Sequence, residues 1–226
     1  MTALSVGLDL GSVNDFSALA VVERVQVLPP GMGFGHYERR HLGPSEPTLT
    51  EELRVVHLQR WETGTPYPTV VDDVCALMRT PQLDESLLWV DSTGVGVAVW
   101  QLFNDAWTAG RMGRYNAQGV TITGGDKSQG RSVTKRDLLS ALLVPVQQGR
   151  LKVAAGLPLG TALERELLAF RLKLTAAGRD TYDVQRKEGE GHGDLTIALA
   201  LAARRANMAG TPELVLHPDT LTQEIR

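Results

Sequence analysis

Three aspartates lie where predicted regular elements begin or end. Asp9 closes the apolar stretch 6–8 and is followed by a glycine turn, and Asp91 closes the apolar run 87–90. Asp194 opens an Ala/Leu-rich run. Because an unpaired carboxylate is costly inside an apolar strand, we expect Asp9 and Asp91 at the carboxyl ends of their strands, facing water, a ligand or a metal. The shared pattern suggests one site.

Such a site restricts the chemistry. Two carboxylates about 4 Å apart repel by about 4 kcal/mol at an effective dielectric constant near 20, so a cluster persists only if protons or cations neutralise it. Oxygen ligands favour Mg²⁺ or Mn²⁺, whereas Zn²⁺ normally recruits His or Cys. The chain hardly offers His or Cys in clusters. We therefore expect Mg²⁺ or Mn²⁺ at Asp9, Asp91 and Asp194.

Each aspartate also has an ordinary structural explanation. An Asp before a turn can hydrogen-bond its own backbone, which suits Asp9 and Asp91. An Asp at a helix start is favoured by capping and by the helix dipole, which suits Asp194. The coincidence of all three with element boundaries favours the ligand interpretation. Asp15, at the start of the returning strand, falls on the same predicted edge and is a possible fourth ligand.

The composition is that of an ordinary globular chain. With 226 residues and 42% apolar residues, we expect a single domain over 1–226. No run of eighteen apolar residues occurs and the amino terminus lacks a signal-peptide pattern, so we expect no membrane association and a cytoplasmic location. The single Cys75 excludes an internal disulfide and is expected to be buried.

The charge is unevenly distributed. The net charge of −3 argues against nucleic-acid binding over the whole surface, but 46–105 carries ten acids against three bases. By contrast, 111–152 carries eight bases against two acids. A nucleic acid would approach this second region, although an ordinary solvated surface would also explain it. The candidate phosphate contacts are Lys127, Arg131, Lys135 and Arg136.

Hydrophobic spacing predicts an opening of three antiparallel strands, followed by alternating helices and strands. Strands are expected over 5–10, 16–27, 53–61, 87–90 and 120–123, with further short ones at 151–154 and 182–186. Helical spacing runs from 69 to the proline at 81, over 95–109, through 138–146 and 163–174, and from 194 to 205. The remaining segments are an exposed excursion at 29–47, a flexible loop at 188–193 and a C-terminal tail at 210–226.

Two motifs together carry a resemblance to a known family. The specific part is Asp91-Ser92-Thr93-Gly94-Val95-Gly96 combined with the later His192-Gly193-Asp194-Leu195. Supporting stretches are Gly7-Leu8-Asp9, Lys135-Arg136-Asp137-Leu138 and Gln148-Gly149-Arg150-Leu151. Over nearly its whole length the chain resembles the nuclease domain of the phage terminase large subunit.

The resemblance implies an RNase H-like α/β fold, with a mixed central sheet of five or more strands in the order 3-2-1-4-5 and helices on both faces. It implies an endonuclease that cuts concatemeric double-stranded viral DNA during genome packaging, alongside a packaging ATPase, a small terminase subunit and a portal. No Gly-Lys dipeptide occurs, so a Walker A loop is absent and ATP-driven translocation is not assigned. The isolated domain is expected to be monomeric.

The resemblance makes Asp9, Asp91 and Asp194 the metal-binding triad. Phosphodiester hydrolysis by two cations about 3.5 to 4 Å apart requires shared carboxylates. We assign Asp9 as the bridging ligand, Asp91 and Asp194 as ligands of separate ions, and Asp15 as an outer or alternate ligand. His192 is an auxiliary candidate that would orient water or phosphate, although a histidine in a loop more often has no such role.

Three alternatives stay open at this point. A Holliday-junction resolvase-like nuclease would prefer branched DNA. An actin-like or sugar-kinase-like ATPase is suggested by 8–12, which resembles the first phosphate loop of those folds, but the late Gly-Gly adenosine motif is absent. A non-catalytic DNA-clamping module would bind without cutting.

Overall fold

The computed structural model describes residues 3–12, 15–33, 49–93, 96–124, 127–176, 193–208 and 213–215. His192, the possible strand 182–186, most of the excursion 29–47 and most of the loop 188–193 lie outside the described residues. None of the described helices is long and apolar enough to cross a membrane.

The centre of the molecule is one mixed sheet. In the described residues it has eight strands in the order β6-β5-β4-β1-β2-β3-β7, with β8 paired to β2. The predicted order 3-2-1-4-5 is therefore confirmed as the middle of a larger sheet. The strands are β1 (Ala3–Asp9), β2 (Ser17–Val27), β3 (Thr50–Trp61), β4 (Leu87–Asp91), β5 (Gln118–Thr123), β6 (Ser132–Thr134), β7 (Leu151–Val153) and β8 (Glu213–Val215).

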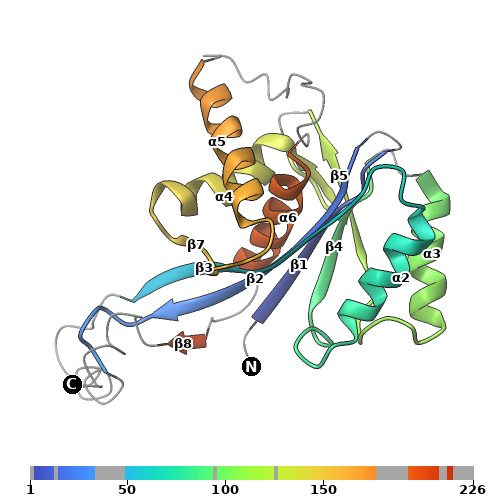
Figure 1. Ribbon diagram of the computed structural model, residues 1–226, viewed down its shortest axis with the longest axis horizontal. Helices are drawn as coiled ribbons and strands as arrows, with labels where there is room; N and C mark the ends of the chain where they lie inside the picture. Colours follow the sequence, from blue (N-terminus) through green and yellow to red (C-terminus); the bar gives the residue numbers. More distant parts are fainter. Residues whose placement is uncertain are drawn as a thin grey trace.

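Helices cover both faces of this sheet (Figure 1). One apolar core joins the sheet to α2 (Tyr67–Met78) and α3 (Gly96–Thr108). The other joins it to α4 (Lys135–Gln147), α5 (Gly160–Ala176) and α6 (Asp194–Met208). Val6 and Leu8 of β1 belong to the first core, and Gly7 between them faces α6. This is the alternation expected of a strand covered on both sides.

The register places the first two aspartates side by side. β1 runs antiparallel to β2 and parallel to β4, with Leu8 opposite Val90. Asp9 and Asp91, one residue further along, therefore end neighbouring parallel strands. Strands β5 and β6 continue in the same direction, so the carboxyl ends of β1, β4, β5 and β6 share one edge. That edge is where open α/β sheets bind ligands.

Helix α6 runs antiparallel to β1. A Cβ atom added to Gly7 would lie 2.1 Å from the carbonyl oxygen of Ala198, so the helix backbone sits directly on the strand. Towards the other end of the helix, Arg24 donates to the carbonyl oxygen of Ala206, and Arg24 is opposite Ala3 at the start of β1. The amino end of α6, with Asp194, therefore lies over the carboxyl end of β1.

Two short strands contradict the predicted elements. The stretch 132–134 was expected only to lead into a helix but forms β6, and 213–215, within the expected C-terminal tail, forms β8. Three residues are too few to show an alternating pattern, so only the neighbouring strand reveals them. The buried Cys75 agrees with the prediction.

The contact at Gly7 predicts a large effect of a single methyl group. Gly7→Ala should lower the free energy of unfolding by about 1–3 kcal/mol, because the backbone of α6 must move away from β1. Urea denaturation followed by circular dichroism measures this change. Gly124→Ala is the matched control, since a Cβ there meets nothing within 4 Å; equal stability of the two variants would contradict the close approach.

Candidate active site

Three elements bring carboxylates to the same edge of the sheet. Asp9 is the last residue of β1, Asp91 is the last of β4, and Asp194 is the first of α6. Asp194 is only 5% exposed, and Asp9 and Asp91 are half-buried. The structure thus places all three predicted residues at one end of the β1–β4 pair, although they come from widely separated parts of the chain.

The neighbouring acids change the pKa of Asp9. Burial raises the pKa of Asp9 well above its ordinary value, and the negative charges of Asp91, Asp194, Glu166 and Asp15 raise it further. Burial also raises the pKa of Asp91, while hydrogen bonds from Thr93 lower it. An edge that concentrates acids in this way favours protons or cations over free carboxylates.

The carboxylates converge without being arranged as a finished metal site. Within the described ranges, no group of three or more His, Cys, Asp or Glu side chains is placed to hold one metal ion. The donor chemistry nevertheless fits a hard divalent cation, because all of the converging groups offer oxygen atoms. Coordination by all three aspartates would require their side chains to move closer together.

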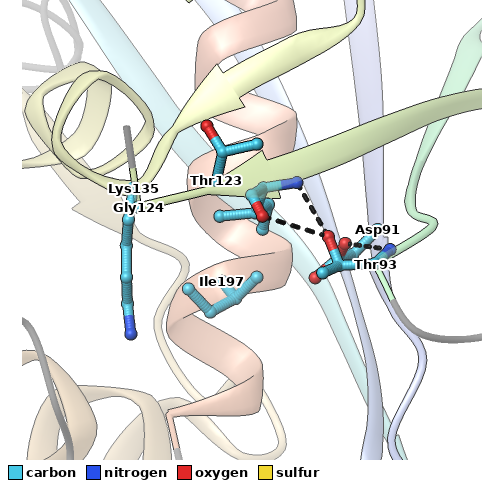
Figure 2. Close-up of a pocket in the computed structure, with 7 residues that line it drawn as sticks. Asp91, Thr93, Thr123, Gly124, Lys135 and Ile197 are labelled. Carbon is cyan, nitrogen blue, oxygen red and sulfur yellow. Dashed lines mark hydrogen bonds between the residues drawn. The ribbon is translucent and has the colours of Figure 1, made fainter. Parts of the chain in front are cut away.

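A pocket of about 310 Å³ opens beside Asp91. Figure 2 shows Asp91 and Thr93 on one side of it and Lys135 on the other, with Ile197 of α6 between them. The complete lining is Asp91, Thr93, Ile122, Thr123, Gly124, Lys135 and Ile197. The pocket is therefore lined both by Asp91, a candidate metal ligand, and by the positively charged Lys135 at the amino end of α4.

Thr93 fixes the position of Asp91. The Thr93 backbone N–H donates to Asp91 Oδ1 at 2.8 Å, and Thr93 Oγ1 accepts from the backbone N–H of Ile122 at 2.7 Å. These bonds tie the turn after β4 to β5, so Asp91 is held by the backbone on one side of the pocket (Figure 2).

Asp15 belongs to the turn that follows β1. Its Oδ2 accepts a hydrogen bond of 2.6 Å from Ser12 Oγ, and its backbone N–H donates to the carbonyl oxygen of Ser12. Gly11 is required here, because a Cβ would lie 2.4 Å from the carbonyl oxygens of Asp15 and Phe16. Asp15 is close enough to raise the pKa of Asp9, and its role as a ligand stays a prediction.

Sequence analysis missed Glu166, which lies on α5 and is 9% exposed. It forms an ion pair with Arg60 and accepts hydrogen bonds from the backbone N–H and the Oγ1 of Thr196, at 3.0 and 3.3 Å. One signal could have found it. Glu166 falls between Leu163 and Leu167 on the predicted apolar stripe of its helix, where an acid needs a specific partner.

The four candidate phosphate contacts differ in their surroundings. Lys135 lines the pocket, and Arg136 next to it is exposed. Lys127 is also exposed. The guanidinium of Arg131 instead donates to the side chain of Gln118, at the amino end of β5 and away from the carboxylates.

No family model and no curated protein sequence matches this chain. Among solved structures, the large terminase nuclease from the thermophilic phage G20c superposes with a TM-score of 0.54 and 22% identity, covering 90% of this chain and 82% of that one. This chain has the fold of a large terminase nuclease domain. The RNase H-like architecture implied by the motifs is thereby confirmed.

Two further solved large terminase structures match this chain less closely. The HK97 bacteriophage large terminase matches with a TM-score of 0.48 and 15% identity over 90% of this chain, which spans 39% of that protein. The nuclease domain of the g2p large terminase from bacteriophage SPP1, with bound Mn, matches with a TM-score of 0.45 and 12% identity, covering 90% of this chain and 86% of that one.

The raised pKa of Asp9 predicts how stability depends on pH. An acid whose pKa is higher in the folded than in the unfolded state, where it is about 3.9, contributes stability that is present at low pH and is lost as pH rises through the folded pKa. In buffer with EDTA, Asp9→Asn should therefore become more stable relative to the wild type as pH rises from about 4 to neutral. The gain should approach about 1.4 kcal/mol for each pH unit between the two pKa values.

Urea denaturation of both proteins at several pH values measures this difference. The exposed Asp105 on α3 supplies Asp105→Asn as the matched control for replacing one carboxylate with an amide. A constant difference between Asp9→Asn and the wild type would show that Asp9 titrates normally.

Proposed function

We propose that this chain is a Mg²⁺- or Mn²⁺-dependent endodeoxyribonuclease that hydrolyses phosphodiester bonds of concatemeric double-stranded viral DNA during genome packaging. The observation that supports it most is the gathering of Asp9, Asp91 and Asp194 at the carboxyl edge of a terminase-nuclease fold. A divalent cation relieves the mutual repulsion of such carboxylates at neutral pH.

Each aspartate has a role in the proposal. Asp9, whose pKa is raised by burial and by the charges of Asp91 and Asp194, would be the ligand shared by two ions. Asp91 and Asp194 would each hold one ion, and Asp15 would be an outer or alternate ligand. When bound, the two cations supply an activated water and neutralise charge on the leaving oxygen.

The residues around the pocket serve binding and orientation. Thr93 keeps Asp91 at the pocket rim through its backbone hydrogen bond. Lys135, which lines the same pocket, is proposed to contact a phosphate of the scissile strand, and Arg136 and Lys127 are proposed as further phosphate contacts. Arg131 is the weakest of the four candidates because its guanidinium is directed towards Gln118.

The wider setting follows from the same resemblance. The proposed partners are double-stranded DNA, a packaging ATPase, a small terminase subunit and a portal, in the cytoplasm of a host cell. The domain by itself is proposed to be a monomer. Because the chain has no Gly-Lys dipeptide and hence no Walker A loop, the ATPase is proposed as a separate partner.

Replacing a ligand should remove activity without unfolding the protein. Asp9→Asn and Asp194→Asn should each abolish Mn²⁺-dependent nicking of supercoiled plasmid DNA, because neither amide can replace the charge of a carboxylate ligand. Gel analysis of plasmid forms measures nicking, and circular dichroism checks the fold. Asp105→Asn is the control that keeps activity. Full nicking by either variant would refute the assignment, and preferential cutting of four-way junctions over linear duplexes would favour a resolvase.

The basic surface should make DNA binding depend on salt. Lys135→Ala should reduce the slope of the logarithm of affinity against the logarithm of salt concentration by about one, as expected for one lost phosphate contact. Fluorescence anisotropy with a labelled duplex measures it, in Ca²⁺ to prevent cutting. Lys152→Ala, on the exposed strand β7 at the far side of the sheet, is the matched control. An unchanged slope in Lys135→Ala would exclude this contact.

A further inference from the structure

Glu166 is a buried acid for which the proposed chemistry has no direct use. Both of its carboxylate oxygens already have partners on other elements: Oε1 accepts from Arg60 of β3, and Oε2 accepts from the backbone N–H and hydroxyl of Thr196 on α6. These contacts hold the Glu166 carboxylate against two other elements. They fasten α5 and β3 to the first turn of α6.

The start of α6 needs such a partner. Helix α6 is preceded by Gly193, which has a φ of +92° and no side chain to accept hydrogen bonds from the first turn. Helices usually satisfy these N–H groups with a capping side chain next to the helix start. Here the acceptor for the Thr196 N–H comes from Glu166 on another helix, thirty positions away. The first turn, which contains Asp194, is therefore held by a side chain from another helix of the same chain.

Arg60 offsets the negative charge of Glu166. Burial and the charge of Asp194 raise the pKa of Glu166, whereas Arg60 and the Thr196 backbone lower it. The guanidinium of Arg60 also lies over the ring of Phe16, 5.0 Å from its centre, next to the turn that carries Asp15. One partly buried ion pair thus connects the elements that carry Asp15 and Asp194.

We propose that Arg60 and Glu166 are positioning residues for the cation site: together with Thr196 they fix the first turn of α6, and so set the placement of Asp194 relative to Asp9. This inference rests on the proposed function. It predicts that the pair governs cation affinity although neither residue touches the cation or the DNA.

Glu166→Gln tests the inference with little change in shape. The glutamine retains one carbonyl oxygen for the Thr196 N–H, but it presents an amide instead of a carboxylate oxygen to Arg60. Residues that orient metal ligands typically change metal affinity 10- to 100-fold when replaced. We expect the dissociation constant for Mn²⁺, measured by isothermal titration calorimetry on the full chain, to rise by about that factor, with a parallel loss of plasmid nicking.

A matched control separates this effect from the loss of any ion pair. Glu51 pairs with Arg24 at 2.6 Å, and that pair lies at the end of β1 away from Asp9. Glu51→Gln should leave the Mn²⁺ dissociation constant unchanged. An equal rise in both variants would overturn the positioning role.

A double variant separates positioning from stability. Breaking one half of a buried ion pair destabilises a protein, whereas replacing both halves with apolar residues often restores stability. Arg60→Met combined with Glu166→Met should therefore recover thermal stability relative to Arg60→Met alone, while Mn²⁺ affinity stays reduced. Recovery of wild-type affinity together with stability would show that the pair acts only on folding, and would overturn the inference.

Asp9→Asn distinguishes failure of this inference from failure of the proposed function. If Asp9→Asn binds Mn²⁺ as tightly as the wild type, the cation site itself is wrong and both proposals fall. If Asp9→Asn loses Mn²⁺ binding but folded Glu166→Gln retains wild-type affinity, only the positioning role is refuted.

Discussion

The direct contact between α6 and β1 is the constraint on which the candidate site depends. Gly7 lies in the middle of a buried strand, where a glycine loses more conformational entropy on folding than other residues and contributes no side chain to the core. In exchange the helix backbone can rest on the strand, with alanines on its contacting face. The antiparallel direction of the helix then carries Asp194 to the end of β1 at which Asp9 is placed.

That packing brings together groups that repel one another. Asp9, Asp91, Asp194 and Glu166 are all wholly or partly buried, and burial together with their mutual charges raises the pKa of Asp9. Hydrogen bonding from Thr93 to Asp91 and the ion pair of Arg60 with Glu166 each offset part of this repulsion. Strongly perturbed acids gathered at a ligand-binding edge are more typical of functional sites than of structural ones. The proposed cations would bring positive charge to this edge.

Local patterns in the sequence predicted much of this arrangement. Asp9 and Asp91 each end an apolar run before a turn, so their position at strand ends could be read directly. The strand order came from the resemblance, and the structure confirms it. Strands β6 and β8 were missed because three residues show no periodicity. The direction of Arg131 was also beyond prediction, because its partner Gln118 is decided by the pairing of β5 with β6.

Glu166 shows where sequence reasoning stops. Like Asp9 and Asp91, it is an acid at a position where the surrounding pattern calls for an apolar residue, and such local conflicts tend to mark functional or strained positions. For the aspartates, the conflict falls at an element boundary, which already indicates the nearby edge of the sheet. For Glu166, it falls inside a helix, and the pattern states only that a partner must exist. Arg60 and Thr196 lie 106 and 30 positions away, so their contact with Glu166 follows from the packing of α5 and β3 around α6 rather than from any local signal.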